Sequence, residues 1–212
     1  MRRNLFKIVA YLVAALAVSS ANAGAYEDFF TAVVRNDAGT IRSLVARGFD
    51  PDSLNPKGQP AIVMAIQAES EGVVEALLEV PTLDVNQVNH VGESALMMAA
   101  LKGRLAWCQK LLDRGAEVNK NGWTPLHYAA TGSATSIVTL LIDKGATLES
   151  ESPNGSTPLM MAAGYGAEAN VDLLLGRGAD PKRLNDLKLS AADFARRAQR
   201  EALGQRLDKL AR

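Results

Sequence analysis

One segment in the middle of the chain, residues 122–145, contains two short helical patterns joined by a turn. Thr124 suits a helix N-cap, and Pro125 suits the first helical turn, where a missing N–H is no loss. A second apolar run follows the break at Gly132, and Gly145 ends it with a residue that tolerates positive φ. Such a unit has two apolar faces and cannot bury them alone, so it needs similar neighbours.

Those neighbours recur at a regular spacing. The place of Leu126 in the segment, called the register position below, is filled in six segments by Phe29, Ile62, Leu96, Leu126, Leu159 and Ala192. The successive spacings are 33, 34, 30, 33 and 33 residues. Nineteen residues after the register position, four segments have the same terminating residue: Gly48, Gly115, Gly145 and Gly178. The second segment has Pro81 there instead.

At these residues the chain resembles the ankyrin repeat family, whose repeat of about 33 residues carries a T-P-L-H-x-A signature. The segments that match the signature are residues 94–100, 124–130 and 157–163, and the matching repeat ends are residues 115–119 and 178–180. The resemblance covers about residues 26–212. It implies an all-α solenoid of about six helix-turn-helix units with short β-turn fingers.

The same spacing predicts how the chain is divided. Residues 24–212 should form one ankyrin repeat domain, with repeats at about 26–58, 59–92, 93–122, 123–155 and 156–188 and a C-terminal cap at 189–212. The connection from Gly115 to Gly122 is shorter than that from Gly145 to Gly155, so the finger between the third and fourth repeats should be truncated. The cap is rich in charge, which fits a solvated helix or, alternatively, a basic docking patch.

Residues 1–23 have the features of a signal peptide. Three basic residues come first, an uncharged apolar stretch follows at residues 8–18, and Ala21-Asn22-Ala23 is an A-x-A cleavage site. The pattern predicts export to a bacterial periplasm or out of the cell. An uncleaved anchor is the alternative, and Arg2-Arg3 leaves the choice between the general and the twin-arginine export routes open.

Removing the signal peptide leaves 20 basic and 23 acidic residues, a net charge of −3. This weak acidic excess gives no electrostatic footprint for nucleic acid. We expect no nucleic-acid partner, no membrane association after cleavage, and a monomer.

The chain offers little for catalysis. The resemblance gives His127 a structural role, hydrogen bonding between adjacent repeats, and His90 lies in a predicted turn. Cys108 is the only cysteine, and we expect it to be a buried apolar residue, with a reactive thiol or an intermolecular disulfide as the alternatives. Gly164-Tyr165-Gly166 resembles a dinucleotide loop but lacks the preceding strand. We expect no enzyme activity, no catalytic residues, no cofactor and no metal.

The five methionines of the mature chain follow the register position closely: Met64, Met97, Met98, Met160 and Met161. Adaptable core filling explains them, and a metal-binding or oxidant-sensing stripe is the alternative.

The resemblance implies that a protein partner binds the concave face formed by the fingers and first helices. The positions that this predicts as partner-facing are Gln59, Gln67, His90, Glu93, Leu101, Lys102, Trp123, Thr131, Ser156 and Tyr165. Trp123 and Tyr165 stand out because aromatic side chains are favoured interface anchors, although either ring could instead cover an adjacent repeat.

Two further functions remain open: an accessory or chaperone-like factor for an exported oxidative-stress enzyme, and a secreted effector that binds a host protein.

Overall fold

A computed structural model describes residues 23–212; the predicted signal peptide lies outside the described residues except for Ala23. Two compact units are present, one ending at Leu83 and the other spanning Asp84–Arg212. Within the described residues the chain forms six helix pairs, so the predicted all-α repeat fold is confirmed.

The first unit contains two helix pairs. A helix over residues 23–35 pairs with α2 (Ala38–Ala46), and α3 (Ala61–Gln67) pairs with α4 (Glu71–Leu78). The second unit contains four pairs, formed by α5 (Ala95–Leu101) and α6 (Leu105–Asp113), α7 (Pro125–Thr131) and α8 (Thr135–Asp143), α9 (Pro158–Tyr165) and α10 (Glu168–Gly176), and α11 (Ala191–Arg197) and α12 (Glu201–Leu210).

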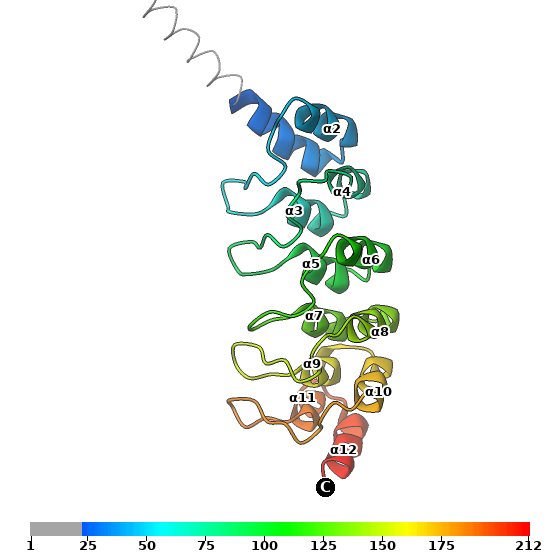
Figure 1. Cartoon of the computed structure of the whole chain (residues 1–212). Helices are drawn as coiled ribbons and strands as arrows, with labels where there is room; N and C mark the ends of the chain where they lie inside the picture. Colours follow the sequence, from blue (N-terminus) through cyan, green and yellow to red (C-terminus); the bar gives the residue numbers. More distant parts are fainter. Residues whose placement is uncertain (1–22) are drawn as a thin grey trace, which may run out of the picture. The chain divides into compact units, whose positions relative to one another are not determined.

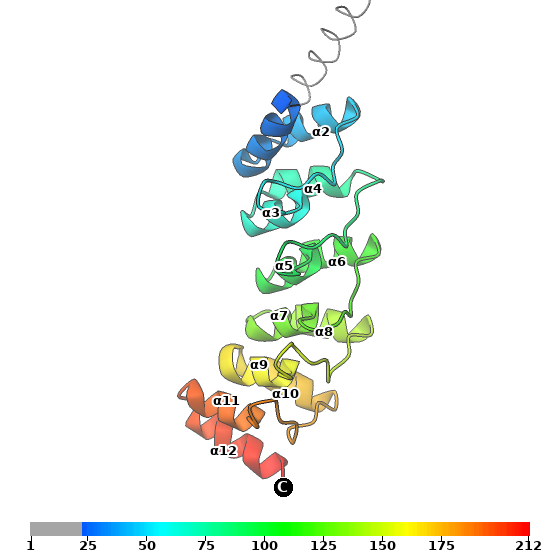
Figure 2. The ribbon, with the colours of Figure 1, turned by 90° about the vertical axis from the view of Figure 1, so that its left-hand side faces the viewer.

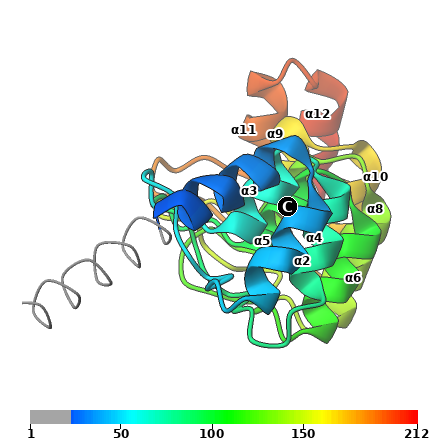
Figure 3. The same ribbon diagram turned by 90° about the horizontal axis from the view of Figure 1, so that it is seen from above.

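In the second unit the first helices α5, α7, α9 and α11 stand in one column, with α6, α8 and α10 in a second column beside it (Figure 1). The loops that connect one pair to the next project together on the opposite side of the first helices, and we call these loops fingers (Figures 1 and 2). Seen from above, α6, α8 and α10 are displaced step by step, so each pair is rotated slightly from the previous one (Figure 3).

The register positions form the core. Phe29, Ile62, Leu96, Leu126, Leu159 and Ala192 are all at most 3% exposed. The alanine pairs that follow them are buried too, since a small side chain lets the next first helix approach closely. The helix pairs therefore bury one continuous apolar interior in each unit, as stacked repeats must.

The terminating glycines work as the sequence predicts. Gly115 and Gly145 have φ of 84° and 89°, a region that favours glycine. In each case the following amide donates to a carbonyl five residues earlier, at 2.9 Å from Ala116 to Leu111 and at 2.9 Å from Ala146 to Leu141. This is the hydrogen bond of a Schellman motif, and it turns the chain from the second helix into the finger.

Four fingers close in the same way. A backbone amide donates to the carbonyl oxygen four residues later, at 55 to 59, 89 to 93, 152 to 156 and 185 to 189, with distances of 2.9–3.0 Å. In the described chain the connection over residues 116–124 has no such bond, as its short length predicts. Neighbouring repeats of the second unit are also joined by Asn119, whose side chain contacts the Gly145 carbonyl and the Thr147 amide at 2.8 and 2.9 Å.

The charged C-terminal segment is a complete helix pair whose arginines bind mainly within the protein. Arg200 Nη1 donates to the carbonyls of Ala162, Ala163 and Gly166 at 3.1, 2.9 and 2.9 Å. These carbonyls lie at the C-terminal end of α9, where the last carbonyl groups of a helix lack a later helical amide, although the Ala162 carbonyl also accepts from the Gly166 amide at 3.0 Å. Arg206 pairs with Glu168 and Asp172 of α10, and Arg196 pairs with Asp208 of α12. These pairings favour a capping role for the segment over a basic docking patch.

Candidate partner-binding surface

An apolar cavity of about 200 Å³ lies among the first helices of the second unit. Its walls come from the end of α5, the residue before the N-cap of α7, α7 itself and α9: Leu101, Trp123, His127, Tyr128, Thr131 and Met161. Three consecutive repeats contribute to it, so the cavity depends on their stacking.

Trp123 forms an aromatic wall of this cavity. Its ring meets two rings of its own repeat edge to face, with centroids 5.3 Å from His127 and 6.3 Å from Tyr128 and interplanar angles of 78° and 87°. This is a preferred arrangement for aromatic pairs. The preceding Gly122 has φ of 78° and lies against Pro153 of the next finger. Trp123 is therefore held in place while part of its ring stays exposed.

Tyr128 is fixed by a residue far away in sequence. Its hydroxyl donates to Glu93 Oε1 at 2.8 Å, and Asn89 Nδ2 donates to the other carboxylate oxygen at 2.8 Å. Burial raises the pKa of Tyr128, and the hydrogen bond to Glu93 and the charge of that carboxylate raise it further. The phenol therefore remains protonated and continues to donate to Glu93.

His127 is fully buried behind the cavity and has partners for both ring nitrogens. Nδ1 accepts from the Thr124 amide at 3.2 Å and lies 2.8 Å from Thr124 Oγ1. Nε2 lies 2.9 Å from the Ser156 carbonyl oxygen, to which it donates. This assigns the neutral tautomer with the proton on Nε2. Burial lowers the pKa of His127, while the bond to the Ser156 carbonyl opposes that shift. The geometry matches the structural role that the resemblance implies.

Three of the residues expected to face a partner come together in the cavity. These are Leu101, which is 45% exposed, Trp123 and Thr131. Tyr165, at the end of α9, does not line the cavity, but it is 67% exposed. The second unit therefore presents an apolar surface along α5, α7 and α9, which we call the α5–α7–α9 surface.

Other expected residues are accessible but lie outside the cavity. His90 and Lys102 are exposed, and Glu93 is partly buried beside Tyr128. Gln59 and Gln67 belong to the first unit and are partly buried; Gln59 Oε1 accepts from Asn55 within its own finger at 2.9 Å.

The expectation that Ser156 faces outward is wrong. Ser156 is 1% exposed, and its hydroxyl accepts from Asn185 Nδ2 at 3.2 Å. Its amide donates to Ser152 Oγ at 3.0 Å, and its carbonyl accepts from His127. The residue is buried because the base of its finger is where two neighbouring repeats meet through hydrogen bonds.

Three residues of the cavity wall, His127, Tyr128 and Met161, were not among the expected partner-facing positions, and His127 was expected to be structural. Two sequence features could have pointed to this surface. Tyr128 is an aromatic residue directly after the motif histidine, and Met161 is the second methionine of a pair. Met97, Met98 and Met160 are buried, so core filling accounts for them, whereas Met161 is partly exposed.

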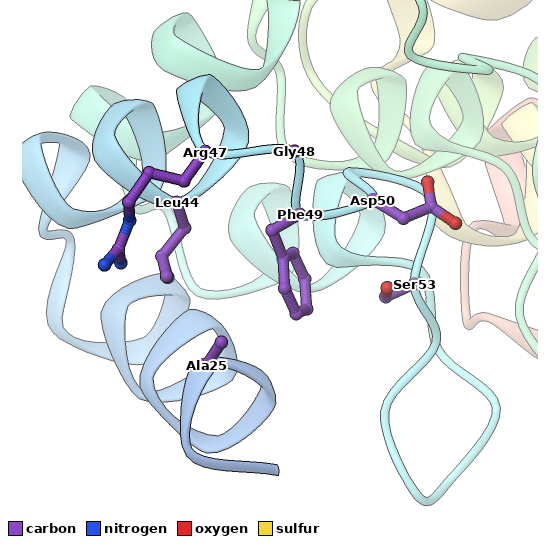
Figure 4. Close-up of a pocket in the computed structure, with 7 residues that line it drawn as sticks. All are labelled: Ala25, Leu44, Arg47, Gly48, Phe49, Asp50 and Ser53. Carbon is purple, nitrogen blue, oxygen red and sulfur yellow. The ribbon is translucent and has the colours of Figure 1, made fainter. Parts of the chain in front are cut away.

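The first unit has its own hollow, of about 410 Å³, near the start of the described chain (Figure 4). Leu44 and Phe49 supply its apolar surface, Ala25 lies on the neighbouring helix, and Arg47 and Asp50 carry charges beside it. This hollow has a single aromatic side chain, and Phe49 already packs on the core ring of Phe29 with centroids 4.5 Å apart. It is a weaker candidate than the cavity around Trp123.

A second hollow of the first unit, about 350 Å³, lies between the helix over residues 23–35 and the finger before α3. Phe30, Val34 and Met64 give it apolar walls, and Val34 is 66% exposed. Each unit thus has an apolar hollow where first helices and a finger meet.

Groups that could support catalysis are buried or scattered. Cys108 is fully buried, and burial raises the pKa of its thiol from 9.0 to about 12, which suppresses the reactive thiolate. Among residues 23–212, no three His, Cys, Asp or Glu side chains are grouped so that they could hold a metal ion. The described helices also include none with the length and apolar character needed to cross a bilayer.

The apparent dinucleotide motif has a structural explanation. Gly166 ends α9, and a Cβ added there would lie 1.9 Å from the carbonyl oxygen of Ala130. A Cβ at Gly164 would lie 3.3 Å from the Phe194 ring. Both glycines thus serve close packing between repeats.

Stacked helix pairs with closed fingers and a histidine joining neighbouring repeats define a solenoid repeat protein. The family model for ankyrin repeats, described as three copies, matches residues 29–121 and 117–185. The chain belongs to the ankyrin repeat family, and ankyrin repeats indicate a protein–protein interaction module.

Similar proteins include the mouse B-cell lymphoma 3 protein homolog, 33% identical over 127 residues, which are 57% of this chain and 28% of that protein. The rat ankyrin repeat and SAM domain-containing protein 6 is 36% identical over 100 residues, 45% of this chain and 11% of that protein. The chain thus spans less than a third of the length of these relatives. Ankyrin repeat relatives are typically non-enzymatic, although some carry enzymatic domains elsewhere in their chains.

Among solved structures, the fold resembles a chain in the complex of a predatory endopeptidase from Bdellovibrio bacteriovorus with an immunity protein. The TM-score is 0.73 and the sequence identity 24%, with 86% of this chain and 97% of that chain covered. This likeness shows the fold.

Proposed function

We propose that this protein is an exported, non-enzymatic interaction module that binds a protein partner on its α5–α7–α9 surface. The observation that carries the proposal is the apolar cavity walled by Trp123 and Tyr128, with the exposed Tyr165 on the same row of helices. Aromatic side chains, particularly Trp and Tyr, dominate the binding energy of protein interfaces.

The size of the cavity favours a protein over a small molecule. Ligand sites of soluble proteins commonly measure about 300–1,000 Å³ and bury most of their ligand. The cavity measures about 200 Å³ and opens among exposed helix ends, so it suits one side chain of a larger partner.

Export is part of the proposal and is supported by the sequence alone. The basic start, the apolar stretch at residues 8–18 and the A-x-A site favour a periplasmic location, with secretion as the alternative. Detection of the protein in culture supernatant, and its depletion from the periplasm, would contradict the periplasmic assignment.

An exported enzyme is one class of partner, for which this chain would be an accessory or chaperone-like factor. A chain of similar fold occurs in a complex of an endopeptidase and an immunity protein, so this architecture is compatible with such assemblies. A secreted effector that binds a host protein is the other candidate.

Affinity capture tests the proposal. Tagged residues 24–212 would be exposed to periplasmic extract beside the Trp123→Ala/Tyr165→Ala double variant and a Ser136→Ala control on α8. One protein retained by wild type and control, and lost by the double variant, is the expected result. Retention by all three would contradict the assignment of the surface, and no captured protein from any exported fraction would contradict the function.

A further inference from the structure

We propose that Asn121 is a site of spontaneous deamidation, and that the isoaspartate formed there displaces Trp123 from its packing against α7. This inference goes beyond the proposed function and does not depend on a partner.

The chain contains two Asn-Gly dipeptides, at residues 121–122 and 154–155. In such a dipeptide the glycine amide nitrogen can attack the asparagine side-chain amide, because glycine has no Cβ to obstruct the approach. A new N–Cγ bond forms, the Cγ–Nδ2 bond breaks, and ammonia leaves with the glycine amide proton. Water then opens the succinimide ring at either carbonyl, which gives aspartate or isoaspartate without any change of oxidation state.

Hydrogen bonds hold one of the two dipeptides, although both asparagines are exposed. Asn154 Oδ1 accepts from the Ser152 hydroxyl at 2.6 Å and from the Ser156 amide at 3.4 Å. The Gly155 amide donates to the Ser152 carbonyl at 2.8 Å, and the Asn154 carbonyl accepts from the Asp186 amide at 3.1 Å. The attacking nitrogen and the amide that it must reach are both fixed here, so the reaction would have to break these bonds.

The other dipeptide has no such restraints. Among residues 23–212 no hydrogen bond involves Asn121 or Gly122. They lie in the short connection over residues 116–124, which also lacks the bond that closes the other fingers. The Gly122 nitrogen and the Asn121 side chain can therefore rotate into contact without losing a hydrogen bond, and deamidation should be faster at this site.

The product at residue 121 would lie between two fixed points. Asn119 is held by two side-chain hydrogen bonds to the next repeat, and Thr124 is buried at the start of α7. Isoaspartate adds one methylene to the main chain between these points, and Gly122 and Trp123 must absorb it. The ring of Trp123 should then leave its edge-to-face contacts with the two rings of α7.

Peptide mapping by chromatography and mass spectrometry tests the site. The purified protein would be kept at pH 8 in buffer and in urea, beside Asn121→Ala, which removes the reactive amide, and the matched control Asn154→Ala. In buffer, residue 121 should deamidate about tenfold or more faster than residue 154, a ratio equivalent to about 1.4 kcal/mol. In urea the two rates should be similar, because each asparagine then precedes a glycine in an unfolded chain.

Tryptophan fluorescence of the incubated native proteins tests the consequence. Quenching by acrylamide should rise in wild type and in Asn154→Ala and stay unchanged in Asn121→Ala. Trp107, the other tryptophan, is only 4% exposed and gives a constant background. Similar rates at both sites in buffer, faster reaction at residue 154, or a ratio no larger than in urea would overturn the inference. Unchanged quenching in wild type that carries isoaspartate at residue 121 would overturn the displacement of Trp123.

Discussion

His127 Nε2 lies 2.9 Å from the carbonyl oxygen of Ser156, which belongs to the next finger of the second unit. The bond links neighbouring repeats from inside the protein, where neither group reaches water. Because the imidazole accepts from Thr124 on its other nitrogen, a second proton would break that arrangement. Protonation of Nδ1 would therefore disturb the start of α7 at Thr124, while Nε2 could still donate to the Ser156 carbonyl.

Stability should fall as the pH drops below about 6.5. Burial lowers the pKa of His127 below its ordinary value of 6.5, so on acidification the unfolded chain takes up the proton before the folded chain does. The contribution of neutral His127 to the free energy of unfolding is complete above the pKa of histidine in the unfolded chain. It is lost as the pH falls through the lower pKa of the folded protein. Urea unfolding at pH 7.5 and pH 5.5 measures the loss.

The same measurement on two variants separates the effect of His127 on the pH dependence from the effect of the carboxylates, which also take up protons on acidification. His127→Gln should have a smaller difference between the two pH values than wild type has. His90→Gln, at an exposed position, should keep the wild-type difference. An equal pH dependence in wild type and His127→Gln would contradict this account.

Gly166→Ala should destabilise the protein by about 3 kcal/mol or more, because the new Cβ would meet the Ala130 carbonyl oxygen and the backbone must shift. Gly176 is a matched control in the adjacent helix α10, where an added Cβ has nothing within 4 Å. Gly176→Ala should be neutral or stabilise by up to about 1 kcal/mol, since alanine favours helix more than glycine does. Equal melting temperatures for the two variants would refute the close approach at Gly166.

Arg200→Ala should loosen the C-terminal helix pair by removing the donor that binds three carbonyls at the end of α9. Hydrogen bonds to charged groups contribute about 1.5–3 kcal/mol, so we expect a loss of that order. Arg197→Ala, at an exposed position of α11, should cost little. Limited proteolysis should cut α11 and α12 first in Arg200→Ala, and an unchanged digestion pattern would argue against the role of Arg200.

Cys108 should react with a thiol reagent only when the protein unfolds. The side chain is buried and its pKa is raised to about 12, so almost no thiolate is present at pH 8. Colour development with an aromatic disulfide reagent should be slow in buffer and complete in denaturant. Rapid stoichiometric labelling of the native protein would instead support the redox alternative.

Leu141→Ala should cost about 2–5 kcal/mol by leaving a core cavity, because Leu141 is fully buried on α8. Leu140→Ala removes the same atoms from the preceding, only partly buried position and should cost clearly less. Thermal melting of both variants distinguishes them, and similar shifts would show that the helix register is wrong.

The helix register was predictable from the sequence because the same pattern of apolar residues and glycines occurs in several repeats, and each copy supports the same assignment. Leu96, Leu126 and Leu159 occupy equivalent buried places, and a glycine of positive φ follows the second helix of each of these three repeats at a fixed distance. The short finger before Trp123 was predictable for the same reason, since a deletion is visible against regular spacing.

The candidate site was predictable only in part, since contacts between repeats depend on side-chain geometry. Leu101, Trp123 and Thr131 follow from their places in the repeat, but the bond from Tyr128 to Glu93 crosses 35 residues with no sequence signal. Ser156 was expected to face outward because of its repeat position beside a finger, yet it is buried among hydrogen bonds to the next repeat. Arg200 belongs to the charged cap, for which a solvated helix was predicted, yet its guanidinium donates to three carbonyls at the end of α9.

Site-specific photo-crosslinking in living cells tests the central claim most directly. A benzophenone amino acid would be placed at Leu101 or Tyr165 on the α5–α7–α9 surface, or at Ser136, an exposed position on α8. Irradiation should link Leu101 and Tyr165 to the same partner protein and give no adduct from Ser136. An adduct from Ser136 alone, with none from the other two positions, would contradict the claim that this surface binds the partner.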